Sequence, residues 1–192
     1  MGSVSSLPGN IPETLLEDYL ELTYLNRNEV LRLLKKIISL SPENNTIDPN
    51  FRYPFYLILE IFPQIRCNPF RDRILKVFSS LDDECLSFED LLDLCSAMSE
   101  NCPDVVKAKW AFQIFDFNSD GFIDEEDMKM IIDRLIQGND TNRIISDVDK
   151  THIVKLLLNA INIQQNGNVN ELEFEHAIGK MPDFKSTFSF RL

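Results

Sequence analysis

The most informative stretch of this sequence reads Asp116-Phe117-Asn118-Ser119-Asp120-Gly121-Phe122-Ile123-Asp124-Glu125-Glu126-Asp127. Side-chain oxygens stand at its first, third and fifth positions, and a glycine follows at the sixth. A hard divalent cation such as Ca²⁺ needs about six to eight oxygen ligands at about 2.3–2.6 Å, so a loop that binds it must curl around the ion. Gly121 permits the sharp turn, because a side chain there would clash. This stretch, the third loop below, therefore predicts a Ca²⁺ or Mg²⁺ site rather than an acidic surface turn that matches by chance.

The predicted ligands are the side-chain oxygens of Asp116, Asn118 and Asp120, the backbone carbonyl of Phe122, Asp124 acting through water, and Asp127. The twelfth position departs from the usual pattern, because Asp127 stands where a glutamate normally chelates with both oxygens. Aspartate is one methylene shorter, so a monodentate contact leaves about six ligands, which is closer to octahedral Mg²⁺. We expect a site that tolerates Mg²⁺ and binds Ca²⁺ more weakly than a loop closed by glutamate.

The same spacing recurs elsewhere in the chain. An apolar residue is followed four residues later by an acid in three places: Leu86 with Asp90, Ile123 with Asp127, and Val169 with Glu173. A loop of about twelve residues between two helices is the frame of an EF-hand. In that frame the central apolar residues of two neighbouring loops join in a short β-bridge, so three visible hands imply a fourth. The only room is around residues 42–60, where prolines and asparagines have removed any ligand pattern.

The other two visible loops are weaker candidates. The fourth loop, residues 162–173, keeps Gly167 and the closing glutamate, but its other ligand positions are amides. A possible weak second metal site consists of Asn162, Gln164, Asn166, Asn168 and Glu173. The alternative is that this loop persists as the β-bridge partner of the third loop. The second loop, residues 79–90, lacks both the glycine and the oxygen pattern, so we expect it to hold no metal.

The rest of the chain reads as a succession of amphipathic helices, so the predicted fold is all-α. We expect four EF-hand units in two lobes with short β-bridges between loops, an N-terminal helix and a C-terminal apolar tail. The predicted segments are a flexible N-terminus over 1–11, an N-terminal lobe without metal over 12–100, a metal-binding C-terminal lobe over 103–181, and a tail over 182–192. Asn101-Cys102-Pro103 marks the boundary between the lobes.

Composition excludes several classes of function. Acidic residues outnumber basic ones 31 to 19, giving a net charge of −12, which disfavours nucleic acid and suits cations and basic peptides. No apolar run is long enough to span a bilayer. The two histidines, His152 and His176, have no nucleophile at a recognisable spacing, so the chain is not expected to be an enzyme. The four cysteines have no metal or redox spacing and are expected to be reduced core thiols of a cytosolic protein: Cys67, Cys85, Cys95 and Cys102.

Several stretches resemble one known family, the calcium- and integrin-binding proteins. They are Leu16-Glu17-Asp18-Tyr19, Leu22-Thr23-Tyr24-Leu25, Asn68-Pro69-Phe70-Arg71-Asp72-Arg73-Ile74, Leu86-Ser87-Phe88-Glu89-Asp90, Ala111-Phe112-Gln113-Ile114-Phe115-Asp116-Phe117, Glu173-Phe174-Glu175-His176, and Pro182-Asp183-Phe184 with Phe188. In order, they cover nearly the whole chain from about residue 15. An aspartate that closes the third hand, like Asp127, is a trait of this family. The family's fourth hand usually binds metal, and the neutral loop from Asn162 departs from that.

The resemblance implies a non-enzymatic adaptor whose hydrophobic groove holds an amphipathic helix. Family partners include the cytoplasmic tails of integrin α subunits, intracellular segments of mechanotransduction channels, and some kinases. The family uses its C-terminal tail as an internal lid over the groove, which implies that role for Phe184, Phe188, Phe190 and Leu192. The alternative is a tail that is packed permanently on its lobe.

The N-terminus carries a possible lipid-attachment signal. Gly2 followed by a serine at position six fits the myristoylation pattern, and many family members carry this modification. A single acyl chain gives reversible binding. We therefore expect a cytoplasmic protein that associates reversibly with the inner face of the plasma membrane when it is lipidated or bound to its partner.

Two other functions remain open at this stage. One is a regulatory subunit of a phosphatase or another enzyme, similar to calcineurin B, although the hands of that family generally all bind metal. The other is a constitutive structural adaptor that always holds Mg²⁺ and does not switch.

Overall fold

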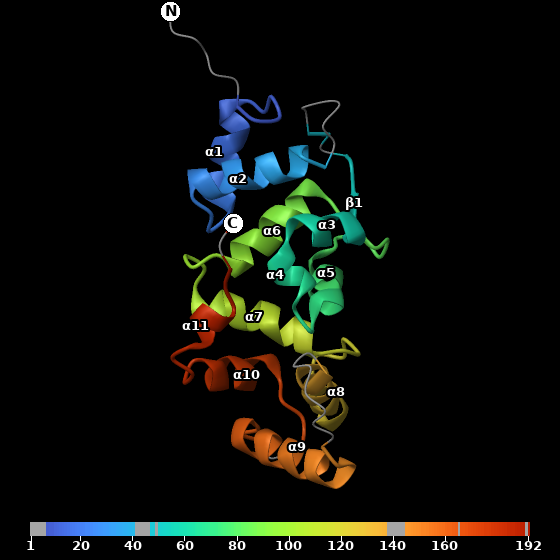
Figure 1. Cartoon of the computed structure of the whole chain (residues 1–192). Coiled ribbons are helices and arrows are strands. Elements are labelled where there is room, and N and C mark those ends of the chain that lie inside the picture. The colour runs from blue at the N-terminus through green and yellow to red at the C-terminus, as the bar shows by residue number, and fades with distance from the viewer. Residues whose placement is uncertain (1–6, 41–46, 49, 138–144, 165, 191) are drawn as a thin grey trace, which may run out of the picture. The chain divides into compact units, whose positions relative to one another are not determined.

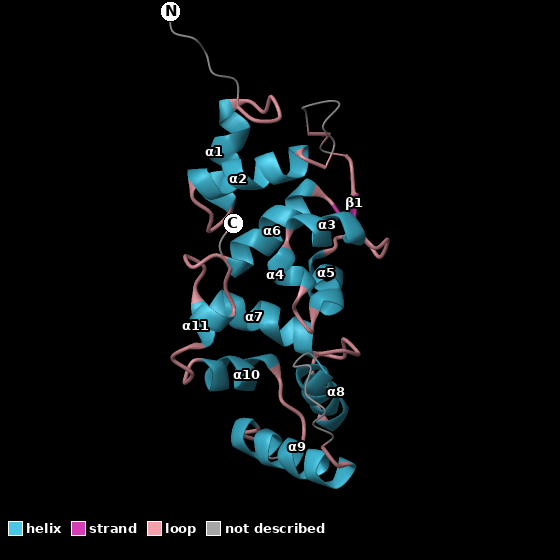
Figure 2. Ribbon diagram, in the orientation of Figure 1, coloured by secondary structure: helices cyan, strands magenta, loops and turns pink. Residues whose placement is uncertain are grey.

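The computed structural model describes residues 7–40, 47–48, 50–137, 145–164, 166–190 and 192. Helices dominate these residues, so the predicted all-α fold is confirmed (Figure 2). The helices are α1 (Glu13–Leu22), α2 (Arg27–Ile38), α3 (Phe55–Ile61), α4 (Pro63–Arg66), α5 (Arg71–Phe78), α6 (Phe88–Met98), α7 (Asp104–Phe115), α8 (Glu125–Gln137), α9 (Asp147–Ile161), α10 (Glu171–Ile178) and α11 (Phe184–Thr187). The strands are β1 (Tyr53–Pro54) and β2 (Cys85–Leu86). No helix in the described part of the chain is long and apolar enough to cross a membrane.

The chain divides into two compact units. The first consists of Met1–Arg66, Phe78–Cys102 and Ser189–Leu192, and the second of Cys67–Val77 and Pro103–Phe188. The units cut across two of the predicted segments. Residues 67–77 belong to the second unit, and the last four residues of the predicted tail belong to the first.

The first unit contains both loops of the predicted degenerate pair of hands, whereas α5, which enters the second of these loops, lies in the second unit except for Phe78. Helices α2 and α3 flank one loop, and α6 follows the other. Strands β1 and β2 pair antiparallel, with Tyr53 opposite Leu86. Tyr53 is therefore the central residue of the hand that the sequence placed around 42–60. Two reciprocal capping boxes fix the starts of α2 and α6, one from Asn26 and Glu29 and one from Ser87 and Asp90.

The second unit contains the other two hands. Helices α7 and α8 flank the third loop, and α9 and α10 flank the fourth loop. Helix α10 lies along α7, and α8 packs against α9 (Figure 1). The core of this unit is formed by Ala108, Ala111, Phe112, Ile123, Met128, Val154, Leu158, Val169, Phe174 and Ile178. Because these side chains come from all four helices and both loop centres, packing in the core sets the position of each loop.

The cysteines are all free thiols, as predicted. Cys95 and Cys102 are buried, and burial raises the pKa of the Cys95 thiol far above its ordinary value. The expectation that all four lie in the core is wrong for Cys67, which is exposed, and Cys85 is only partly buried. Cys67 follows directly after α4, where the chain turns through solvent.

Candidate metal centre

The third loop begins at Asp116, which is the C-cap residue directly after α7. One carboxylate oxygen of Asp116 accepts the N–H of Asp120 at 3.2 Å, and the other accepts the N–H of Gly121 at 2.9 Å. Asp120 accepts the N–H of Phe122 at 2.9 Å and the side-chain amide of Asn118 at 2.9 Å. The side chain of Asp116 therefore faces the inside of the curled loop, and those of Asn118 and Asp120 meet beside it.

The turn at the sixth position has the backbone conformation that the sequence predicts. Gly121 has a φ of +85°, in the left-handed region that favours glycine. A Cβ atom added there would meet nothing within 4 Å. Glycine is therefore required by the backbone angle and not by the space around it.

The twelfth position is held by a reciprocal cap at the start of α8. Asp124 accepts the N–H of Asp127 at 3.1 Å, and Asp127 accepts the N–H of Asp124 at 3.1 Å. The other oxygen of Asp127 accepts the N–H of Phe117 at 3.0 Å, across the loop. The second and fourth loops have the same arrangement at their twelfth positions. Asp90 forms a reciprocal capping box with Ser87, and Glu173 forms one with Asn170. The acid at position twelve is thus tied to the helix that follows each loop.

The electrostatics of the third loop favour a cation. Asp127 is only 1% exposed. Burial raises the pKa of Asp127 despite the backbone N–H groups that it accepts, and the nearby carboxylates of Asp124 and Asp116 raise it further. Carboxylates crowded in this way repel one another, and a divalent cation relieves that repulsion.

The oxygen donors of the third loop fit Ca²⁺ or Mg²⁺ by their chemistry, since both ions prefer carboxylate, amide and carbonyl oxygens. Within the described residues, no three Asp, Glu, His or Cys side chains converge on one point. The carboxylates of the third loop accept backbone N–H groups instead. To hold an ion, some of these oxygens have to turn inward.

Arg73 supports this site and was not identified by the sequence analysis. It lies on α5, is 7% exposed, and donates to the carbonyl of Gln113 at 2.8 Å and to that of Ile114 at 3.3 Å. It also donates to the carbonyl of Asp116. These carbonyls end α7, where a helix leaves acceptors without internal partners. A positive charge there also suits the helix dipole. Residues 67–77 belong to the second unit in part because Arg73 closes this helix end.

Arg73 has a second role beside the loop. Its guanidinium lies 5.5 Å from the ring centroid of Phe117, and that of Arg134 on α8 lies 4.7 Å from the same centroid. Arg134 also pairs with Asp72, next to Arg73 on α5, with one N–H···O distance of 2.8 Å. The two helices that flank the third loop are therefore both fastened to α5. The only sequence signal for this was that Arg73 falls within the stretch from Asn68 to Ile74 that carries the family resemblance.

The fourth loop has the same shape with fewer charges. Gly167 has a φ of +87°, and Glu173 accepts the N–H of Gln164 at 2.9 Å and that of Asn170 at 3.1 Å. Burial acts to raise the pKa of Glu173, but the backbone N–H groups outweigh it, so the pKa is lowered. This carboxylate is ready to act as an anionic ligand.

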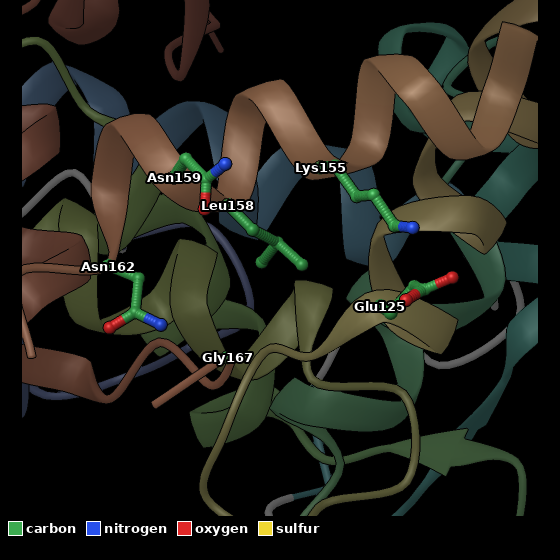
Figure 3. A pocket seen from close by; sticks show the side chains of 6 residues that line it. All are labelled: Glu125, Lys155, Leu158, Asn159, Asn162 and Gly167. Atoms are coloured by element: carbon green, nitrogen blue, oxygen red, sulfur yellow. The ribbon is translucent and has the colours of Figure 1, made fainter. Parts of the chain in front are cut away.

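Asn162, the first residue of the fourth loop, provides the test of whether a cation fits. Its side chain is 7% exposed, and its Oδ1 has no hydrogen-bond partner among the described residues. It extends from the end of α9 toward the loop that carries Gly167, and both residues line a cavity of about 590 Å³ (Figure 3). A buried oxygen without a partner is rare and costly, so this atom fits a ligand that accepts its lone pair.

The two loops of the second unit are joined through their backbones. Ile123 and Val169 form the predicted β-bridge, with both N–H···O distances at 2.9 Å. Both side chains are fully buried. The backbones of the third and fourth loops are therefore linked directly at their centres.

The four tail residues that were predicted to cover the groove are all partly buried: Phe184, Phe188, Phe190 and Leu192. Phe184 and Phe188 stack with centroids 5.5 Å apart and pack on the core of the second unit. Lys107, fully buried on α7, donates to the carbonyl of Phe188 at 2.8 Å.

The end of the tail contacts the first unit. The N–H of Phe190 donates to the carbonyl of Met98 at 3.1 Å, and the carbonyl of Leu192 accepts from Arg32 at 3.2 Å. The lipidation candidate Gly2 lies outside the described residues.

Comparison with known proteins identifies the family. Residues 105–179 match the model of the EF-hand domain pair. Calcium and integrin-binding family member 2 of rat and that of human are each 32% identical to this chain over 185 residues, covering 94% of this chain and 95% of the relative. The Drosophila melanogaster protein of the same name is 34% identical over 186 residues, with the same coverage. The sequence of the run from Gly121 to Asp127 favoured family member 4, and these comparisons do not confirm that member. On this evidence the chain belongs to the calcium and integrin-binding protein family.

Proposed function

We propose that this protein is a non-enzymatic regulatory adaptor that binds Ca²⁺ or Mg²⁺ in the third loop. The observation that carries the proposal is the loop itself, in which the buried Asp116 and Asp127 bracket a left-handed turn at Gly121. The residues that would hold the ion are Asp116, Asn118, Asp120, the carbonyl of Phe122, Asp124 through water, and Asp127. A bound cation supplies the positive charge that draws these oxygens together.

The occupant of the adaptor's groove is proposed to be an amphipathic helix from the cytoplasmic segment of a membrane protein. The relatives are named for calcium and integrin binding, and an integrin α tail is such a segment. A segment of a mechanotransduction channel is a second candidate partner, and kinases a third. The net charge of −12 favours a basic apolar helix in each case.

The C-terminal tail is proposed to cover the groove until a target displaces it. Support comes from the partial burial of its apolar side chains. The stacked pair Phe184 and Phe188 is held by the bond from Lys107 to the carbonyl of Phe188. An incoming helix can replace apolar contacts of this kind with its own.

Membrane association is proposed to come from Gly2 together with the partner. One myristoyl chain binds a membrane only marginally, so the bound target supplies the second attachment. The proposed location is therefore the cytoplasm and, when the protein is lipidated or bound to its partner, the inner face of the plasma membrane. Mass measurement of native protein tests this, and an unmodified Gly2 contradicts it.

Pull-down with integrin-tail and channel peptides tests the adaptor function. The wild type is compared with Asp116→Ala in Ca²⁺, in Mg²⁺ and in chelator. We expect Asp116→Ala to weaken capture, because it removes the ligand at the first position. Asp147→Ala is the matched control, since its carboxylate lies in the same unit and is 99% exposed. Equal recovery of the wild type and a folded Asp116→Ala variant would contradict the proposal of metal-dependent capture.

A constitutive structural adaptor is the second candidate, favoured by the short acid Asp127. If Mg²⁺ always occupies the third loop, the addition of Ca²⁺ does not change the conformation of the protein. Trp110 reports on this, because it lies on α7 five residues before Phe115. A change in its fluorescence when Ca²⁺ is added over Mg²⁺ supports a switch, and no change supports the structural role.

A further inference from the structure

The second loop has the shape of a metal-binding loop although it lacks the glycine and most of the ligands. Leu86 and Asp90 hold its eighth and twelfth positions, as Ile123 and Asp127 do in the third loop. Glu84, at the sixth position, has a φ of +55°, in the same left-handed region as the glycines of the other loops. A side chain rarely adopts this conformation without support. Something therefore holds the second loop closed.

That support comes from the guanidinium of Arg52. Its Nη1 donates to Ser80 Oγ at 2.9 Å and to Asp90 Oδ2 at 3.2 Å. Its Nη2 donates to the carbonyl of Cys85 at 2.9 Å and to Ser79 Oγ at 3.1 Å. Nη2 and Nε also form a fork on Asp83, with distances of 2.9 and 2.6 Å.

Four of these five acceptor residues stand at ligand positions of a metal loop, and the fifth, Ser80, stands at the second position, which is not one. Ser79, Asp83, the carbonyl of Cys85 and Asp90 stand at positions one, five, seven and twelve. In a binding loop, these positions direct oxygens at the ion. Arg52 therefore occupies the centre of the second loop, and its planar group donates in several directions at once.

The charges agree with this arrangement. Arg52 is a permanent cation, its side chain is 19% exposed, and it faces the carboxylates of Asp83 and Asp90. The hydrogen bond from Arg52 lowers the pKa of Asp83, and the same bond raises the pKa of Arg52. Each group thus holds the other in its charged form.

The position of Arg52 in the chain explains how it reaches the loop. It directly precedes Tyr53, which pairs with Leu86 across the two strands. The first hand of the pair therefore provides the cation, and the second hand provides the oxygens. We propose that Arg52 is a built-in cation that takes the place of a metal in the second loop and keeps this pair of hands closed whether or not Ca²⁺ or Mg²⁺ is present.

Hydrogen–deuterium exchange of the full chain tests this, read by mass spectrometry on peptides that cover residues 79–90. In the wild type we expect the same exchange in chelator and in Ca²⁺. Arg52→Ala is expected to speed exchange of this segment about tenfold or more, because charged hydrogen bonds of this kind are lost. Ca²⁺ is then expected to slow exchange again in this variant, since the freed oxygens of Asp83, Cys85 and Asp90 can bind it.

Two controls make the result specific. Lys35→Ala removes one positive charge from an exposed site on α2 in the same unit, and it is expected to leave the segment unchanged. Asp83→Asn is expected to speed exchange of residues 79–90 as well. In a chain that already carries Arg52→Ala, it is expected to speed exchange by a smaller factor than it does in the wild type, because the pair of Arg52 and Asp83 is already broken.

Several results would overturn the proposal. Unchanged exchange in Arg52→Ala would mean that the arginine forms only a surface ion pair. Slower exchange of the wild-type segment on addition of Ca²⁺ would mean that the metal displaces it. If Arg52→Ala does not fold, Arg52→Lys provides the test, because an ammonium keeps the charge but lacks the fork. Exchange intermediate between that of the wild type and Asp83→Asn supports the proposal, and exchange equal to the wild type overturns it.

Discussion

We expect Asp127 to determine which ion the third loop prefers. Its carboxylate is 1% exposed and is tied by backbone N–H groups from Asp124 and Phe117. It can therefore reach an ion only if these bonds loosen or if the start of α8 moves inward. The corresponding acid of the fourth loop, Glu173, has one more methylene with which to reach.

Replacing Asp127 by glutamate is expected to tighten Ca²⁺ binding about tenfold and to reduce competition by Mg²⁺, because a bidentate ligand raises the coordination number. Calorimetric titration of Ca²⁺ in the presence and absence of millimolar Mg²⁺ measures both effects. Asp147→Glu, the same change at a carboxylate whose side chain is 99% exposed, is the control and should leave the affinity of the third loop unaltered. A Ca²⁺ affinity that Mg²⁺ does not affect in the wild type would refute this account of Asp127.

Gly121 gives a second prediction for a single residue. Gly121→Ala is expected to lower the free energy of unfolding by about 1–2 kcal/mol, because alanine is strained at positive φ although there is room for its Cβ. Gly179→Ala is the control. Gly179 is right-handed at φ −60°, and its added Cβ makes only ordinary contact at 3.4 Å, so this change should be neutral or slightly stabilising. Urea unfolding of both variants in chelator measures the two changes in the free energy of unfolding. Equal losses of stability would show that the positive φ of Gly121 is not the cause of the effect.

The sequence suffices to propose ligands in the third loop, because metal chemistry requires particular residue types at fixed spacing, and their role stays a prediction. The two arginines could not be predicted. Arg73 acts on Asp116, which is 43 residues away, through a backbone carbonyl that any residue has. Arg52 reaches Ser79 across 27 residues. Contacts that depend on chain topology leave no local pattern, so only the folded structure reveals them.

The β-bridge between Ile123 and Val169 is the element that connects the two loops of the second unit. It was predictable, because each loop has an apolar residue at its centre and the two must pair to bury their side chains. The helices of these two hands were predictable from apolar periodicity, whereas the placement of residues 67–77 in the second unit was not. Those residues read as part of the hand that contains the second loop, and only the contacts of Arg73 and Phe70 place them with α7.

The bridge predicts a response of the fourth loop to metal bound in the third. Addition of Ca²⁺ at a concentration that fills only the tighter site is expected to slow exchange of the Val169 amide, because that N–H donates to Ile123. Nuclear magnetic resonance of the labelled protein resolves this amide. Asp116→Asn is expected to abolish the effect while leaving the bridge formed. An unchanged Val169 signal in the wild type would show that the loops act independently.

Across the whole molecule, the negative charge of the EF-hand loops is expected to be balanced in two different ways. In the first unit, Arg52 provides the positive charge for the second loop. In the second unit, the third loop concentrates carboxylates whose charge a bound divalent ion would balance. We therefore expect a response to metal in the second unit, which also packs Phe184 and Phe188 of the tail. This gives a physical reason for metal binding and target capture to be coupled there.

The most direct test is calorimetric titration of the full chain with Ca²⁺, comparing the wild type with Asp116→Asn and with the exposed control Asp147→Asn. We predict that the wild type and Asp147→Asn bind Ca²⁺ with the same affinity, and that Asp116→Asn loses the strongest site. Wild-type protein that takes up no Ca²⁺, or a folded Asp116→Asn variant that binds as the wild type does, would contradict the assignment of the third loop as the metal centre.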